Sequence, residues 1–230
     1  MTKDGDKKSK AELVVQSIQE KIKTNPGLQR HLTVFKALLS EIPGGGAFIY
    51  LLDDHIAAKK EERIIKFMEE TVQAIAQVND RIDQEKLKTD HYAFIFEECL
   101  RGVARHPQKE KIDSYKAILI NAAVPSTISD DEQEYFLNLV NTLSPVHIRL
   151  IAALNEARKI PQGGGRESGF KLRTHLGNTS SEILMSAAAE LYQLQFTNTE
   201  PRSIPFDADM SRVGGRLTPI AMKFIEFCTL

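Results

Sequence analysis

The sequence predicts a mainly α-helical fold: a helical bundle with one long helix at about residues 47–84, followed by a small α+β module at the C-terminus. Three observations indicate this fold class. Residues 47–101 contain no glycine or proline, and apolar residues recur there every three or four positions, which is the period of an α-helix. Capping residues precede many of the helical segments. The last third of the chain mixes short helical patterns and alternating patterns with turns.

Composition excludes the extreme classes of protein. Of the 230 residues, 42% are hydrophobic and 27% are charged, so the chain can form a core. The 30 Lys and Arg residues nearly balance the 31 Asp and Glu residues, for a net charge of −1. A disordered polyelectrolyte is therefore excluded, and a protein that clamps nucleic acid with its whole surface is not favoured.

Residues 1–9 are expected to form a flexible, solvated tail, because they contain charged residues and no apolar run. They lack the hydrophobic segment of a secretion signal, which indicates a cytoplasmic protein. The longest uncharged apolar stretch, residues 42–52, is much shorter than the ~18 residues that a membrane span needs. Both cysteines, Cys99 and Cys228, have hydrophobic neighbours, so we expect buried thiols rather than a disulfide.

Residues 10–143 are predicted to form the helical bundle. At ~1.5 Å per residue the long helix would span about 50 Å, more than a domain of this size buries, so a projecting end or a dimer contact is expected. Ser9 and Ser129 are each followed three residues later by Glu, which is the capping-box pattern. The helices of the bundle are expected at about 10–23, 28–41, 47–84, 89–105, 108–123 and 130–143.

Residues 144–230 are predicted to form a second module, with a glycine-rich loop at 158–169. The first expected elements are helices at 145–158 and within 170–176, and a third helix that starts at a capping box formed by Thr179 and Glu182 and ends at about 191. A strand at 192–197, a turn-rich wing and a return strand at 216–218 follow. The last expected element is a helix that starts at Thr218-Pro219. This order of elements is that of a winged helix-turn-helix.

A family resemblance agrees with this interpretation. Residues 216–227, which read RLTPIAMKFIEF, resemble the closing segment of uncharacterised prokaryotic winged-helix-like modules, although Ala221 stands where such segments often have glycine. Residues 43–46, which read PGGG and precede the long helix, are similar to helical bacterial proteins of unknown function. Some of those proteins are found near phage-defence or mobile genes. The resemblance implies a prokaryotic protein with a regulatory or defence-associated role, and it implies no catalytic residues.

A DNA-binding regulator is one alternative function. The arginines of the predicted wing, Arg202, Arg212 and Arg216, are its candidate nucleic-acid-binding residues, because guanidinium groups bind phosphates. However, the helix that would enter the major groove has no Lys or Arg between residues 174 and 201 and carries glutamates instead. Phosphate would repel such a helix, so nucleic acid is a disfavoured partner.

A ribonuclease is a second alternative. The spacing of Arg101 and His106 is similar to that of the Arg and His in helical ribonuclease toxins of the HEPN class. The His would transfer protons near neutral pH and the Arg would stabilise the charge that develops on phosphate. Basic residues are also favoured in the last turn of any helix by its dipole, and that capping role is the preferred interpretation.

No other set of polar residues indicates catalysis. The histidines lack partners at metal-ligand spacing, and Cys99 and Cys228 are far apart in the sequence. The glycines at 44–46 lack the Lys of a phosphate-binding loop, and the cluster at 53–55 (Asp-Asp-His) fits the first turn of a helix. We therefore predict a non-enzymatic protein that acts through protein–protein contact or self-association, with no metal and no cofactor.

Overall fold

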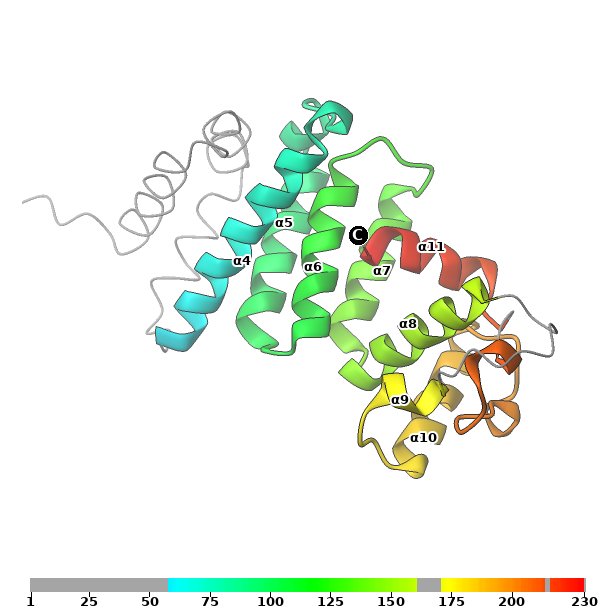
Figure 1. Ribbon diagram of the computed structural model, residues 1–230. Helices are drawn as coiled ribbons and strands as arrows, with labels where there is room; N and C mark the ends of the chain where they lie inside the picture. Colours follow the sequence, from blue (N-terminus) through cyan, green and yellow to red (C-terminus); the bar gives the residue numbers. More distant parts are fainter. Residues whose placement is uncertain (1–57, 161–170, 214–215, 230) are drawn as a thin grey trace, which may run out of the picture. The chain divides into compact units, whose positions relative to one another are not determined.

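A computed structural model of the chain describes residues 58–160, 171–213 and 216–229. The fold is mainly helical, as predicted (Figure 1). Contacts divide the chain into two compact units, Met1–Leu137 and Asn138–Leu230. The helices predicted at 10–23 and 28–41, the start of the long helix, and most of the glycine-rich loop lie outside the described residues.

Three helices of the first unit lie side by side in Figure 1: α4 (Ala58–Gln77), α5 (Asp90–Arg105) and α6 (Lys109–Ala122). Two short 3₁₀ helices, η2 (Asn79–Arg81) and η3 (Lys86–Lys88), connect α4 to α5. A further helix, α7 (Asp130–Thr142), begins in this unit and continues past the division.

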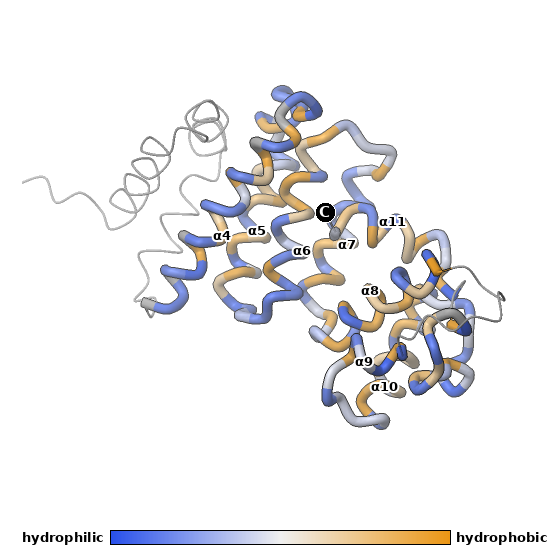
Figure 2. Tube along the Cα trace, viewed as in Figure 1, coloured by the Kyte–Doolittle hydropathy of each residue, from blue (hydrophilic) through white to orange (hydrophobic). Residues whose placement is uncertain are grey.

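The packing of α5 on α6 is the most extensive of any helix pair in the described residues. Gly102 of α5 allows this approach, since a Cβ built there would lie 2.3 Å from Cζ of Tyr115 on α6. Tyr115 is fully buried, and so is Tyr92 of α5, whose hydroxyl donates to the carbonyl of Leu119 at 3.2 Å. Figure 2 shows hydrophobic residues on these helices interleaved with hydrophilic ones, as amphipathic helices require.

The predicted long helix ends sooner than expected, at Gln77 instead of residue 84. The chain beyond it contains no helix breaker, so tertiary contacts end the helix. The backbone N–H of Asp83 donates to the carbonyl of Ala123 at 2.9 Å, and Nζ of Lys86 donates to that of Val124 at 3.2 Å. The side chain of Leu87 is also buried. These contacts turn the connection toward the C-terminal end of α6.

The second unit is built around α8 (Pro145–Lys159). This helix packs on α9 (Leu172–Leu176), α10 (Ser181–Gln193) and α11 (Pro219–Cys228). Two 3₁₀ helices, η4 (Pro201–Ser203) and η5 (Met210–Arg212), lie in the segment between α10 and α11, and η4 packs on α10 while η5 packs on α8. The ring of Phe196 contacts that of Phe224 of α11, with 5.1 Å between centroids.

Four helix caps predicted from the sequence fall within the described residues, at Ser129, Ser144, Thr179 and Thr218, and three are confirmed. Ser129 and Glu132 form the capping box of α7, with the Ser129 N–H donating to Glu132 Oε2 at 3.0 Å. Ser144 is the N-cap of α8, and Thr218 accepts from the Ala221 N–H at the start of α11. The prediction for α10 is off by one residue, because the N-cap is Ser180 and its side chain accepts from the Ile183 N–H.

The two predicted strands of the second unit are wrong. The described residues contain no β-strand, only isolated antiparallel bridges, of which one pairs Thr197 with Leu217 and another pairs Lys171 with Asp209. The winged-helix β-module is therefore not supported, although the helices of this region follow the predicted order. The segment 192–197 was misinterpreted because α10 continues to Gln193 and then ends in a tight turn.

That turn is a Schellman motif, which closes a helix by two crossed backbone hydrogen bonds. The Phe196 N–H donates to the carbonyl of Leu191 at 2.8 Å, and the Gln195 N–H donates to that of Tyr192 at 2.9 Å. Gln195 adopts φ +58°, the left-handed conformation that usually belongs to glycine. The apolar alternation at 192, 194 and 196 thus arises from the end of a helix, with Phe196 buried beside Leu191.

Among the described helices, none is both long and apolar enough to cross a membrane alone. The pair α7 and α8 passes that length and hydropathy test only when the two are counted together as one bent span.

Candidate functional site

Apolar side chains reach solvent along one edge of α10. Tyr192 is 43% exposed, and Met185 and Ala189, which precede it by seven and three residues and therefore lie on the same side of the helix, are partly exposed. We call these three residues the α10 outer face. Ile183 is 54% exposed, but it lies nine residues before Tyr192 and therefore on the other edge of the helix. The side between the two edges is buried in the unit through Leu184, Ala187, Ala188 and Leu191.

The charges beside the α10 outer face are acidic. The helix contains Glu182 and Glu190 and no basic residue. At its start, the guanidinium of Arg173 donates to Ser181 Oγ and to the Thr179 carbonyl, both at 3.3 Å. Hydrogen bonds to its own backbone N–H and to Ser180, with a smaller contribution from the Arg173 charge, lower the pKa of Glu182. Glu182 therefore stays ionised well into the acidic range.

Ser144, His147 and Glu190 form a polar array between α8 and α10. Nδ1 of His147 lies 2.8 Å from Ser144 Oγ and accepts from the Ser144 backbone N–H at 3.1 Å. Because Nδ1 accepts, the ring proton is assigned to Nε2, which lies 3.1 Å from Glu190 Oε2. The order Ser, His, carboxylate is that of a hydrolase triad. Here the serine and histidine form the capping box of α8, so the array positions α10 on α8.

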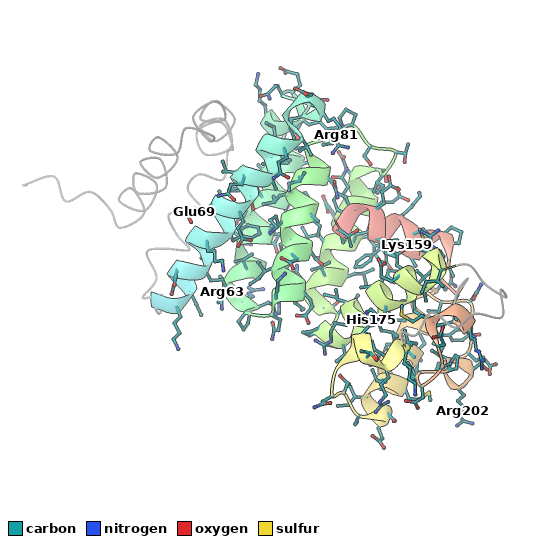
Figure 3. All side chains as sticks on the ribbon, viewed as in Figure 1. Arg63, Glu69, Arg81, Lys159, His175 and Arg202 are labelled. Atoms are coloured by element: carbon teal, nitrogen blue, oxygen red, sulfur yellow. The ribbon has the colours of Figure 1, made fainter. Side chains whose placement is uncertain are left out.

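The structure does not bring the three predicted nucleic-acid-binding arginines together as free cations. Arg216 is half-buried, and its Nε donates to the carbonyl of Val213 at 2.9 Å, which holds its own loop. Arg202 on η4 and Arg212 on η5 are exposed, and Arg202 extends from the edge of its unit in Figure 3. Asp207 in the same segment lies 3.8 Å from Nε of Arg173.

The two residues of the predicted ribonuclease pair have separate environments. Arg101 forms ion pairs with Glu97 and with Glu98, the latter at 2.7 Å, on the exposed side of α5. His106 is the C-cap residue of α5, and its ring stacks on Tyr115 with 6.4 Å between centroids. The cations whose charges act on His106 are Lys111, Arg105 and Arg63, and Arg101 is not among them. This favours the capping interpretation of that spacing.

Arg63 of α4 is a structural residue that the sequence did not reveal. Its Nε donates to the carbonyl of Val103 and its Nη2 donates to that of Ala104, each at 2.8 Å. Figure 3 labels Arg63 on the side of α4, next to α5. One guanidinium therefore satisfies two of the carbonyls that the C-terminal end of a helix leaves without partners. No spacing in the sequence signals this contact, since the partners are 40 and 41 residues away.

The surroundings of His106 are electropositive. Burial lowers the pKa of His106, and the positive charges of Lys111, Arg105 and Arg63 lower it further. Lys111 has only 3% of its surface exposed, and burial lowers its pKa as well. A neutral imidazole is therefore favoured at neutral pH unless an anion is near it.

The described residues contain no group of three or more His, Cys, Asp or Glu side chains that could hold a metal ion. His91 comes nearest to such a group, lying 3.6 Å from Asp130, 3.5 Å from Glu134 and 3.2 Å from the amide of Gln133. Cys99 and Cys228 are buried free thiols, as predicted, and burial, with a smaller effect of Glu98, raises the pKa of Cys99.

Comparisons with known proteins identify no relative. No family model matches the chain, no curated protein matches it, and no solved structure matches its fold.

Proposed function

We propose that the protein acts by binding another protein, and that the α10 outer face is the contact surface. The observation that supports this is the exposure of Tyr192 beside Met185 and Ala189, on a helix whose adjacent side is firmly packed. Aromatic side chains are enriched in the cores of protein interfaces, while Lys and Glu are depleted there. Because the helix is already folded, binding through such residues does not require the loss of conformational entropy that ordering a flexible segment would cause.

The partner that fits this face has an apolar segment flanked by Lys or Arg. Fully burying a side chain of this size contributes about 1.5–3 kcal/mol, and Tyr192 is 43% exposed, so Tyr192 would supply roughly 1 kcal/mol. Glu182, three residues before Met185, borders the face and would attract basic groups. Such charges mainly raise the association rate and the specificity of an interface.

A photo-crosslinker placed at position 192 in the full chain tests this proposal in cells. The expected result is an adduct with one discrete protein, whose yield falls when Met185 is replaced by Ser. The matched control is the same crosslinker at Thr174, which is exposed on α9 of the same unit. Equal adduct patterns at 174 and 192, or an adduct that Met185→Ser leaves unchanged, would contradict a specific face.

Once that adduct identifies the partner, the charge of the face can be tested directly. Glu182→Lys should slow association with the purified partner and should reverse the effect of salt on the association rate, because exposed charges steer the encounter. Binding to duplex DNA that is lost in the double variant Arg202→Gln/Arg212→Gln, with no protein adduct at 192, would instead favour the DNA-binding alternative.

A further inference from the structure

Three helices of the first unit bring cationic groups to one place, which we call the α5–α6 corner: Arg63 of α4, Arg105 and His106 at the end of α5, and Lys111 in the first turn of α6. The connection from α5 to α6 is only three residues, 106–108, so the end of one helix and the start of the next are adjacent. The ring of Tyr115 forms one side of the corner by stacking on His106.

The capping of α5 does not account for this charge. Of the last four carbonyls of the helix, that of Gly102 accepts from the His106 backbone N–H at 2.8 Å. Those of Val103 and Ala104 accept from Arg63. Three of the four are thus satisfied by one guanidinium and one backbone group. The side chains of Arg105 and His106 are not needed for that purpose.

Three carboxylates near the corner are engaged with other cations. Glu97 and Glu98 pair with Arg101, and Asp113 pairs with Lys109. Among the described residues, no acidic side chain forms an ion pair with Arg105, which is exposed. The positive charge of the α5–α6 corner therefore reaches solvent through Arg105, next to the partly exposed ring of His106.

We propose that the α5–α6 corner binds a phosphate group. The exposed guanidinium of Arg105 offers a planar pair of donors that matches phosphate oxygens, and a protonated imidazole at His106 adds charge. The start of α6 also contributes, because its N-cap, Gln108, makes no side-chain hydrogen bond to the first N–H groups. The phosphate group could belong to a free ion, a nucleotide or a nucleic-acid strand, since all three present the same oxygens.

Binding of phosphate would reverse the shift at His106. A dianion in the corner favours the imidazolium, so the pKa of His106 should rise toward or above its ordinary value when the site is filled. By linkage, phosphate should bind more tightly as the pH falls through that pKa.

The test follows the imidazole signals of His106 by NMR in the full chain at pH 6.5, as inorganic phosphate replaces chloride at constant ionic strength. A saturable shift is expected in the wild type. Arg105→Gln should weaken the affinity about tenfold, which corresponds to about 1.4 kcal/mol. Arg101→Gln is the matched control, because Arg101 lies on the same exposed side of α5 but pairs with glutamates, and it should bind as the wild type does.

The result that overturns the proposal is a His106 signal that does not respond to phosphate, or a response that Arg105→Gln and Arg101→Gln change equally. Circular dichroism and thermal unfolding of both variants show whether the fold is intact, which is expected since both arginines are exposed. Tyr192→Ser should leave the response unchanged, so this proposal and the protein-binding proposal succeed or fail separately.

Two further probes distinguish the source of the phosphate. A single-stranded RNA oligonucleotide that binds more tightly than inorganic phosphate, with an affinity that falls steeply with salt, identifies a nucleic-acid backbone. A mononucleotide that binds at least as tightly as the oligonucleotide identifies a small ligand. In either case Arg105→Gln must weaken binding. If Arg105→Gln leaves the affinity unchanged, the ligand binds outside the α5–α6 corner.

Discussion

The contact between Gly102 and Tyr115 determines how closely α5 and α6 approach each other. A methyl group at 102 would meet two ring carbons of Tyr115 at 2.3 and 2.6 Å and its hydroxyl oxygen at 2.7 Å, and Tyr115 is fully buried, so the ring has little room to move. Overpacking of a core costs about 1–3 kcal/mol, whereas Ala in place of Gly gains about 1 kcal/mol of helix propensity. The steric term should prevail.

We therefore expect Gly102→Ala to lower the free energy of unfolding by up to about 2 kcal/mol in a urea titration, as the difference between overpacking and propensity. The double-mutant test uses Tyr115→Ala as its background. There the obstruction is gone, and Gly102→Ala should become neutral or stabilising. If Gly102→Ala destabilises both backgrounds equally, the ring of Tyr115 is not the cause.

His106 should make the stability of the fold depend on pH. Its pKa in the folded protein lies below the ordinary value of 6.5, so between those two values the unfolded chain binds a proton that the folded chain does not. Stability is therefore complete above about pH 6.5, falls as the pH drops through this window, and is unaffected by His106 below its folded pKa.

His106→Asn removes that contribution. Urea midpoints measured between pH 5 and pH 8 in the absence of phosphate should fall less steeply with acidification in the variant than in the wild type. Above pH 7.5 the two should change with pH in parallel. A wild-type profile that is no steeper than that of the variant would show that His106 does not titrate abnormally.

At the scale of elements, Arg63 joins α4 to the end of α5. Hydrogen bonds that involve a charged group contribute about 1.5–3 kcal/mol, and Arg63 makes two of them to backbone carbonyls. Arg63→Met keeps the apolar stem and should lower the free energy of unfolding by about 2 kcal/mol. Arg63→Lys should retain less than half of that stabilisation, because a single ammonium group does not reproduce the two donors of the guanidinium.

Thermal or urea unfolding measures this effect, and Arg101→Met is the control. Arg101 is 45% exposed and pairs only with carboxylates on its own helix. Exposed pairs of this kind contribute about 0.3–0.5 kcal/mol. Similar losses for Arg63→Met and Arg101→Met would mean that the two carbonyls of α5 do not need Arg63.

The end of α10 offers a stabilising change. A non-glycine residue in the left-handed conformation costs about 1–2 kcal/mol, and Gln195 holds φ +58° in the Schellman motif. Gln195→Gly removes that strain but adds freedom to the unfolded chain, so a net gain of about 0.5–1 kcal/mol is expected. The midpoint of unfolding should rise, and Gln195→Ala should not raise it.

Sequence patterns located most helices well where local signals decide them. Ser129, Ser144 and Thr218 were recognised as caps because an N-cap depends on residues within one turn. The end of α4 and the end of α10 were missed for different reasons. The chain after α4 turns away because of contacts with residues 123 and 124, which are distant in the sequence. The end of α10 has Gln195 at the left-handed position, where glycine usually marks the end of a helix in a sequence.

The candidate sites show the same limit. The lack of basic residues in α10 was read correctly from the sequence, since charge along one helix is a local property. Arg63 and Lys111 were missed as neighbours of His106, because three separate helices bring them together. The spacing of Arg101 and His106 does not reveal that Glu97 and Glu98 engage Arg101, since each ion pair depends on side-chain geometry.

At the scale of the whole molecule, α7 is the element that belongs to both units, since it runs from Asp130 to Thr142 across the division at residues 137 and 138. Asn138 is exposed at that point. Proline within a helix costs about 3 kcal/mol, whereas alanine is the best helix former. Breaking α7 at Asn138 should therefore disturb structure on both sides of the division.

Asn138→Pro should increase hydrogen exchange in segments 130–137 and 139–142 alike and lower the unfolding midpoint, while Asn138→Ala should leave exchange unchanged or slow it. Exchange that increases on one side only would show that the two parts of α7 are independent.

The near neutrality of the chain, 30 basic against 31 acidic residues, conceals an uneven distribution of charge. The α10 outer face is bordered by Glu182, and the α5–α6 corner gathers arginine, lysine and histidine. The average charge of the chain therefore predicts neither partner. The α10 outer face should bind a basic partner, and the α5–α6 corner should bind an acidic one.

The close contact of Gly102 with Tyr115 also restricts how the sequence can diverge. Any distant homologue that keeps an aromatic ring at position 115 must keep glycine at 102, and one that acquires a larger residue at 102 must replace the ring by something smaller. The two positions are 13 apart, and their identities should change together across an alignment even after the surrounding residues have become unrecognisable.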